Sequence, residues 1–138
     1  MRQLATVVSV ETQRGLTDVT PSVQRVVRSA GIRDGLCTIF LQHTSASLVI
    51  QENADPSVRH DLEAFLSRLV PDGDPLFTHT TEGADDMPAH VKAALTKTSE
   101  QIPVVRGELA LGTWQGIFVW EHRRRSQRRQ IAIHVLGE

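Results

Sequence analysis

Four extended segments follow one another in the last third of this sequence, and their order restricts the fold more than any other feature. They are "IPVV", "ELAL", "QGIFVWEH" and "RQIAIHVL". Their spacing is that of strands joined at hairpin distance, whereas helices separate the earlier strands. The order therefore predicts an α+β fold in which antiparallel or mixed sheets are covered by two to three helices.

The first two thirds of the chain are predicted to alternate between strands and helices. Residues 3–11, "LCTIFLQ" and "SLVIQE" have the patterns of strands. The stretch "LTDVTPSVQRVVRSAGI" predicts a helix capped by Asp18 or Thr20, with Pro21 in its first turn and Gly31 at its end. A shorter helix is expected near 87–97.

The strongest helix signal lies between residues 55 and 70. Asp55 is a predicted N-cap, and Pro56 occupies the first helical position. Apolar residues then recur at three- and four-residue spacing before Pro71, namely Val58, Leu62, Phe65, Leu66 and Leu69. This spacing predicts one buried helix face.

A single domain over residues 1–138 is the simplest organisation. A chain of 138 residues with 40% apolar residues can bury an ordinary core. The one linker-like stretch, residues 71–86, is too short to separate two domains. No apolar run has the length of a membrane span, and the alternating N-terminal stretch differs from a secretory leader. We therefore expect a cytoplasmic protein without membrane partners.

Charge is unevenly distributed although the formal net charge is only -1. Residues 71–86 carry five carboxylates and no Lys or Arg, whereas residues 122–129 carry five arginines and no carboxylate. We call these the acidic loop and the basic corner. Because nucleic-acid-binding domains usually carry a clear cationic excess, the small net charge makes nucleic acid an unfavoured partner.

Three histidines stand at positions where polar chemistry meets regular structure. His43 follows a predicted strand, His79 lies in the acidic loop, and His90 lies in the first turns of the next helix. Their spacing is too wide for a local ligand motif, so the fold would have to assemble any metal site. Each one could instead be an ordinary surface or hydrogen-bonded core histidine.

Several stretches together resemble the YjbQ family, whose members are sometimes called secondary thiamine-phosphate synthases. They are "HTSAS", "ENADPSVRHDL", "LFTH", "ADDMPAH" and "LGTWQGIFVWEH", and they span nearly the whole chain in the family's order. The resemblance implies a compact α+β fold, a homotrimer, and a histidine-lined polar site that can hold a metal ion. It also implies thiamine-phosphate synthesis, in which a pyrimidine diphosphate joins a thiazole phosphate with loss of pyrophosphate.

The resemblance implies that His43, His79 and His90 are the metal ligands. Three imidazoles suit zinc or nickel better than magnesium, which prefers oxygen ligands. Either magnesium then arrives with the phosphorylated substrate, or the metal at the histidines serves another reaction. Asp86 stands where the family often has asparagine, so its charge either strengthens cation binding or is simply tolerated.

The remaining candidates fall into two groups. Asp85 and Glu121 are candidate acid–base residues, with helix capping and structural charge balance as their alternatives. The candidate substrate-binding residues are Thr44, Ser45, Ser47, Trp114, Gln115, Arg128 and Arg129.

Each substrate-binding candidate also has a structural alternative. The hydroxyls bind phosphate, orient His43 by hydrogen bonding, or satisfy local backbone groups. Trp114 either lines a heteroaromatic pocket with Gln115 or lies in a trimer interface. The arginines bind phosphate, form a solvated hairpin or make a weak RNA-binding patch, and Arg123, Arg124 and Arg125 exceed the family pattern.

Two other functions remain open on sequence grounds. A metal-dependent hydrolase would act on a small phosphorylated compound. A non-catalytic trimer would bind a metabolite or nucleic acid without turning it over, and strongly salt-dependent binding would favour nucleic acid.

Overall fold

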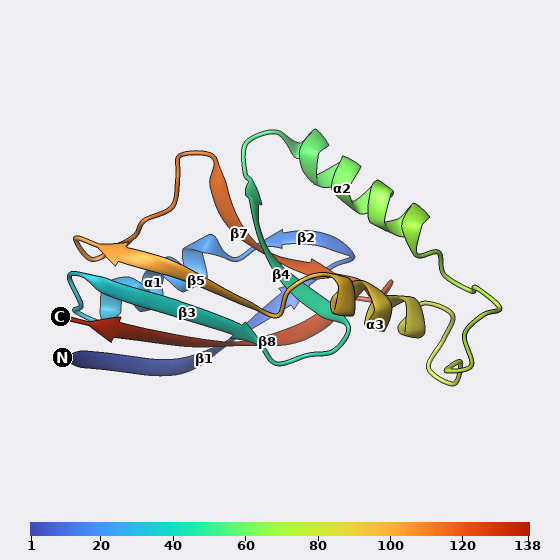
Figure 1. Ribbon diagram of the computed structural model, residues 1–138, viewed down its shortest axis with the longest axis horizontal. Coiled ribbons are helices and arrows are strands. Elements are labelled where there is room, and N and C mark those ends of the chain that lie inside the picture. The colour runs from blue at the N-terminus through green and yellow to red at the C-terminus, as the bar shows by residue number, and fades with distance from the viewer.

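Two antiparallel sheets and three helices form the computed structural model, which describes residues 1–138 (Figure 1). One sheet has the strand order β1-β8-β3-β5-β6, and the other has the order β2-β7-β4. The strands are β1 (Arg2–Thr12), β2 (Gly15–Asp18), β3 (Gly35–Leu41), β4 (Ala46–Glu52), β5 (Ser99–Val105), β6 (Glu108–Leu109), β7 (Gln115–Glu121) and β8 (Gln127–Gly137). The helices are α1 (Thr20–Ser29), α2 (Pro56–Leu69) and α3 (Asp86–Leu95). The predicted α+β class is confirmed.

Strand β8 organises the larger sheet because it pairs with β1 on one side and β3 on the other. Its side chains alternate between the two faces of the sheet, as the two-residue period of a strand requires. Arg129 is buried in phase with Ile131, Ile133 and Val135. The buried face of β8 therefore carries one charged residue at its beginning.

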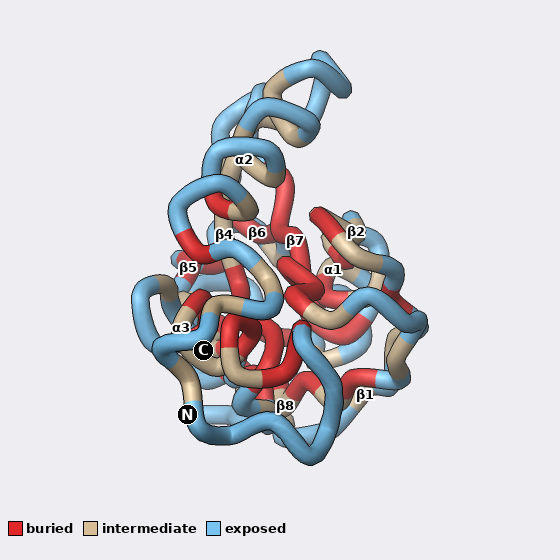
Figure 2. Tube along the Cα trace, turned by 90° about the vertical axis from the view of Figure 1, so that its right-hand side faces the viewer, coloured by how far each residue is buried: buried red, intermediate tan, exposed pale blue.

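The hydrophobic core lies between the two sheets and α1. It includes Val23 and Val27 of α1, Ile39 of β3, Ile117 of β7 and Ile133 of β8, all almost completely buried. Burying an aliphatic side chain of this size contributes about 1.5–3 kcal/mol to the free energy of folding. Figure 2 shows this buried centre, with α2 projecting away from it.

The predicted cap of α1, Asp18 or Thr20, is wrong. The helix begins at Thr20, and Val19 occupies the N-cap position without a side-chain capping bond. Asp18 Oδ1 nevertheless accepts a hydrogen bond from the Thr20 N–H at 2.9 Å. The preceding residues form the short strand β2, which pairs with β7 and was not predicted. Four residues are too few for a periodic pattern, and it is the pairing with β7 that makes them a strand.

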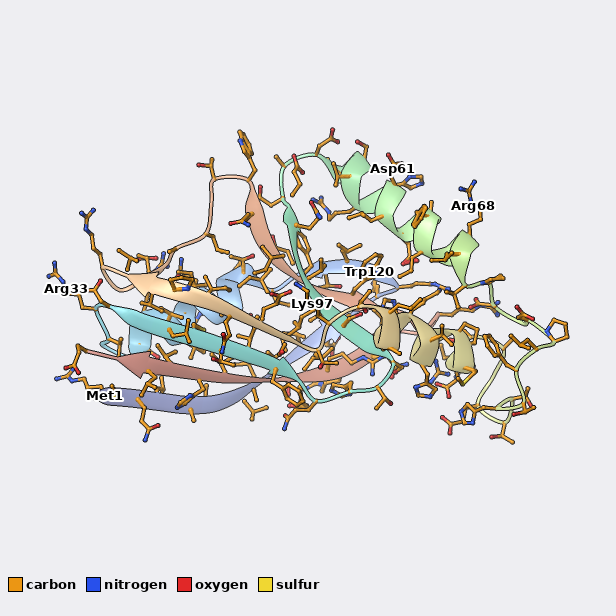
Figure 3. The ribbon with its side chains drawn as sticks, in the orientation of Figure 1. Met1, Arg33, Asp61, Arg68, Lys97 and Trp120 are labelled. Atoms are coloured by element: carbon orange, nitrogen blue, oxygen red, sulfur yellow. The ribbon has the colours of Figure 1, made fainter.

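Helix α2 begins as predicted but packs differently. Asp55 Oδ1 accepts a hydrogen bond from the Ser57 N–H at 2.9 Å, which confirms the N-cap. The predicted buried face is only partly formed. Leu66 is buried and Val58 and Leu62 are half-buried. Phe65 and Leu69 were also assigned to this face, but each is 59% exposed. In Figure 3, Trp120 lies beneath the helix.

Three segments that are distant in sequence meet at one end of the molecule. They are the β3–β4 connection, the end of β7 with the turn that follows it, and α3 with the acidic loop before it (Figure 1). No helix of the chain is both long and apolar enough to cross a membrane. Most of the candidate residues lie where these three segments meet.

Candidate metal centre

His79, Asp86 and His90 form a compact group of side chains that could hold a metal ion, and we call it the histidine group. His79 Nε2 lies 2.7 Å from Asp86 Oδ2, and His90 Nε2 lies 3.1 Å from the same oxygen. One potential ligand atom from each residue lies within 4.8 Å of the others. Helix α3 contributes Asp86 and His90 one turn apart, so both side chains lie on the same helix face. The acidic loop brings His79 to them.

The contact of His90 Nδ1 determines which ring nitrogen carries the proton. His90 Nδ1 lies 2.8 Å from the carbonyl oxygen of Thr44, and a carbonyl can only accept, so Nδ1 carries a proton. In a neutral imidazole, Nε2 then has a lone pair directed at Asp86 Oδ2. Two electron-rich atoms face each other at 3.1 Å unless a proton or a metal ion lies between them.

Asp86 is an ionised carboxylate in a nearly buried position. Its exposed fraction is 2%. Burial alone would raise its pKa, but the contact with His79 and the charges of His90 and Arg123 outweigh burial and lower the pKa below its usual value. An anionic oxygen therefore stands between two imidazole rings.

The acidic loop and the basic corner meet beside this group. Arg123 Nη1 lies 2.8 Å from Asp86 Oδ1, and Arg123 Nε lies 2.9 Å from Asp85 Oδ2. The Arg124 N–H donates to the same Asp85 oxygen at 2.9 Å. Although burial opposes the shift, these bonds lower the pKa of Asp85 to about 2. Arg123 thus anchors both aspartates at the start of α3.

Asp85 occupies the N-cap position of α3, but its side chain makes no capping hydrogen bond. Its oxygens bind the basic corner instead. The predicted capping alternative is therefore wrong for this side chain. The predicted acid–base role of Asp85 stays a prediction, and an ion-paired carboxylate with a low pKa is a weak proton acceptor at neutral pH.

His43 lies outside the group, although it was predicted to be its third ligand. His43 Nε2 accepts a hydrogen bond from the Gln130 N–H at 2.7 Å, so this nitrogen is occupied. His43 Nδ1 faces Arg129 Nη1 at 3.3 Å. Burial lowers the pKa of His43, and the charge of Arg129 lowers it further. In this structure Asp86 takes the place that the sequence interpretation gave to His43.

The hydroxyls near His43 are engaged inside the protein. Ser45 Oγ accepts from Arg129 Nη2 at 2.9 Å, and Ser47 Oγ lies 2.6 Å from His122 Nε2. Both serines are buried, which favours their structural alternative over contact with substrate. Thr44 is exposed, and its hydroxyl makes no hydrogen bond within the chain. Of the three, only Thr44 is open to a ligand.

Glu121 is completely buried and fully paired. Arg129 donates to it from Nε at 2.7 Å and also from Nη2. Thr12 Oγ1 donates at 2.6 Å, and the Arg123 N–H donates at 3.0 Å. This pairing favours structural charge balance over acid–base catalysis for Glu121. It also occupies most donors of Arg129.

Arg128 and the "TWQ" stretch lie away from the histidine group. Arg128 pairs with Glu11 at 2.9 Å on the surface. Trp114 is 64% exposed in the loop before β7, and Gln115 begins that strand. Because β7 ends at Glu121, about 20 Å of strand separates the two ends. Within one chain, Trp114 and Gln115 therefore do not line the histidine group.

An open pocket of about 240 Å³ adjoins the group on the side of His79. Its walls include Pro75 and Phe77 from the acidic loop and Met87 and Pro88 from α3. The side chain of His79 is 41% exposed, so the ligand group can be reached from solvent. A small molecule could therefore lie beside a bound metal ion.

Sequence reasoning left two residues of this site without an assigned role. Asp86 was noted only as an added charge, and Arg123 was set aside with the surplus arginines. The i, i+4 spacing of Asp86 and His90 on one predicted helix could have identified this ligand pair. The opposite charges of the acidic loop and the basic corner could have indicated the contact with Arg123.

The model of the family described as "UPF0047 protein YjbQ-like" matches residues 5–138. A UPF0047 protein of Synechocystis is 53% identical over 138 residues, which cover 99% of this chain and 94% of that protein. The UPF0047 protein YjbQ of Escherichia coli is 50% identical over 104 residues, which cover 75% of each.

Solved structures show the same fold. A protein of Aeropyrum pernix has a TM-score of 0.85 at 32% identity, covering 98% of this chain and 99% of that one. A YjbQ/UPF0047 family protein of Clostridium acetobutylicum has a TM-score of 0.83 at 36% identity, covering 95% of this chain and 99% of that one.

Proposed function

The chain belongs to the YjbQ-like UPF0047 family, and on this premise we propose that it is a metal-dependent enzyme acting on a phosphorylated small molecule. The proposed ion is zinc or nickel, held by His79, Asp86 and His90. The proposed reaction joins a pyrimidine diphosphate to a thiazole phosphate and releases pyrophosphate.

The main support for this proposal is the protonation state of the His90 ring. Its Nδ1–H donates to the Thr44 carbonyl at 2.8 Å, which leaves the lone pair of Nε2 directed toward His79 and Asp86. A backbone carbonyl that orients a histidine in this way is the usual support of a metal-bound imidazole. Two imidazoles and one carboxylate suit zinc and leave a coordination position for substrate or water.

The chemistry of pyrophosphate loss agrees with this ligand set. Negative charge grows on the leaving group, and a bound divalent ion would supply Lewis-acid stabilisation of that charge. Asp86 orients toward the two imidazoles because Arg123 holds its other oxygen at 2.8 Å. The pocket beside His79 would seat the organic part of the substrate.

An assay with two readouts tests the proposed reaction. Protein purified without chelator is mixed with the pyrimidine diphosphate, the thiazole phosphate and magnesium. We expect both thiamine phosphate and pyrophosphate to form, and we expect a His90→Ala variant with little bound metal to form neither above background. Metal content is measured on the same samples, so the site is judged separately from the reaction.

The two products also separate the alternatives. Pyrophosphate without thiamine phosphate would indicate a hydrolase, a function favoured by the reachable position next to His79. Substrate binding without either product would indicate a metabolite-binding protein, since affinity alone supplies no catalysis. Either result would contradict the synthase assignment without contradicting the proposed metal site.

We also propose that the protein is a homotrimer, the assembly that the resemblance implies, and apolar side chains exposed in two places support association. On the outer face of the larger sheet, Val7 is 52% and Phe40 is 47% exposed, and β8 lies between their strands. On α2, Phe65 and Leu69 are both 59% exposed. Exposed apolar groups of this kind mark surfaces that bind other proteins. Trp114 would be a further contact.

Sedimentation equilibrium at micromolar concentration tests the assembly. We expect a mass three times that of the 15.3 kDa chain. Phe40→Glu should shift the equilibrium toward smaller species, because it would place a charge in the proposed contact. A parent protein that stays monomeric would contradict both the trimer and the interface role of Trp114.

A further inference from the structure

Beside the histidine group, two hydrogen-bond donors face each other without an acceptor. The Gln130 N–H donates to His43 Nε2 at 2.7 Å, so Nε2 carries no proton. A neutral imidazole has one N–H, which must therefore be on Nδ1. Nδ1 lies 3.3 Å from Arg129 Nη1, which is also a donor.

The other nitrogens of Arg129 are satisfied. Nε and Nη2 donate to Glu121, and Nη2 also donates to the carbonyl and the hydroxyl of Ser45. Nη1 makes no hydrogen bond to an oxygen of the chain, and its one contact at hydrogen-bond distance is His43 Nδ1. Arg129 is only 5% exposed, so its position is fixed by burial and by four hydrogen bonds to Glu121 and Ser45. A buried donor without an acceptor is costly.

We propose that His43 Nδ1 and Arg129 Nη1 form an oxyanion subsite that receives a phosphoryl oxygen. One oxygen that accepts from both donors removes the conflict between them. The inference rests on the proposed function, because it assigns the phosphoryl end of the substrate to this pair. It also gives His43 a role in binding substrate in place of the predicted role as a metal ligand.

The subsite is joined to the proposed metal centre through the backbone. Thr44 follows His43 directly, and its carbonyl accepts from His90 Nδ1 at 2.8 Å. Adjacent Cα atoms are about 3.8 Å apart, so the two sites are neighbours. The exposed hydroxyl of Thr44, which has no partner within the chain, is available on the same segment.

The charges of Arg129 and Glu121 predict that the subsite has only modest affinity for free phosphate. Glu121 already neutralises Arg129, so the subsite offers directed donors and little net positive charge. Free inorganic phosphate should therefore bind on the order of millimolar, with the rest of a substrate supplying further affinity.

Phosphate titration of the full-length protein tests the subsite. NMR signals of the imidazole and guanidinium nitrogens are followed in chelator-treated and metal-loaded samples, with acetate as the comparison anion. We expect a saturable shift at His43 Nδ1 and Arg129 Nη1 in both samples, and a weaker response to acetate. His43→Leu should weaken phosphate binding about tenfold. His43→Asn should retain more binding, because its amide can donate near the position of Nδ1.

His134→Leu is the matched control, because His134 lies in β8 and contacts Gln3 on the surface. It should bind phosphate like the parent. Equal phosphate binding by the parent and His43→Leu would overturn the subsite and indicate the surface arginines. A parent without saturable binding would overturn it as well.

Metal content of the same variants separates this inference from the proposed function. His43→Leu should keep the metal content of the parent. Loss of metal together with phosphate would make His43 a metal ligand and overturn the subsite. Phosphate binding at His43 in a parent that takes up no metal, even when purified without chelator and incubated with zinc or nickel, would support the subsite and contradict the proposed metal centre.

Discussion

Replacing His90 by alanine is expected to reduce bound metal from about one ion per chain to nearly none. His90 would supply one of three protein ligands, and changes beyond the direct ligands already weaken metal binding about 10- to 100-fold. His79→Ala should have the same effect. Asp86→Asn should weaken binding less, because the amide oxygen can still coordinate although it lacks the charge. Elemental analysis after gel filtration measures the stoichiometry.

Three other histidine variants serve as controls for metal content. His60→Ala and His134→Ala should keep the metal of the parent, because both side chains are on the surface and outside the ligand group. His43→Leu should keep it as well. If His43→Leu lost metal while His79→Ala retained it, the ligand group inferred from the structure would be wrong.

Glu121→Gln is expected to lower the free energy of unfolding by about 3–5 kcal/mol, the usual cost of breaking a buried ion pair by removing one partner. The side chains of Arg129 and Glu121 are only 6% and 0% exposed. The substitution leaves the Arg129 charge buried without its counter-charge. Urea unfolding at one fixed protein concentration measures the change, since assembly makes stability depend on concentration.

The chain contains a matched control for this pair. Arg128 neighbours Arg129 and pairs with Glu11, but these side chains are 65% and 77% exposed. Because exposed ion pairs contribute little to stability, Glu11→Gln should lower the free energy of unfolding by less than about 1 kcal/mol. Equal losses in the two variants would mean that burial does not distinguish the pairs, and the structural role given to Glu121 would fail.

Local signals in the sequence predicted most of the fold. Asp55 and Pro56 mark the start of α2 because capping chemistry depends on neighbouring residues. The alternation in β8 is equally local. The exposed face of α2 could not be predicted, because periodicity shows that a helix has an apolar face and does not show what covers it.

The candidate site was predictable only in part. His79 and His90 stood out by their positions in the sequence and were assigned as ligands from the resemblance, and the structure brings them together. His43 was grouped with them because chemical type alone cannot show that the Gln130 N–H occupies its Nε2. That Arg129 is buried and Arg128 is exposed could have been predicted from the sequence. Arg129 is in phase with the apolar Ile131, and the adjacent strand residue must face the other way.

The central claim is that His79, Asp86 and His90 hold a metal ion. A crystal structure of protein purified without chelator, with anomalous data collected at the zinc and nickel edges, tests this claim most directly. It should show a peak about 2.0–2.2 Å from Nε2 of each histidine and from an Asp86 oxygen, with His43 still bonded to Gln130. A metal peak coordinated by His43, or metal-loaded crystals without a peak between these three side chains, would contradict it.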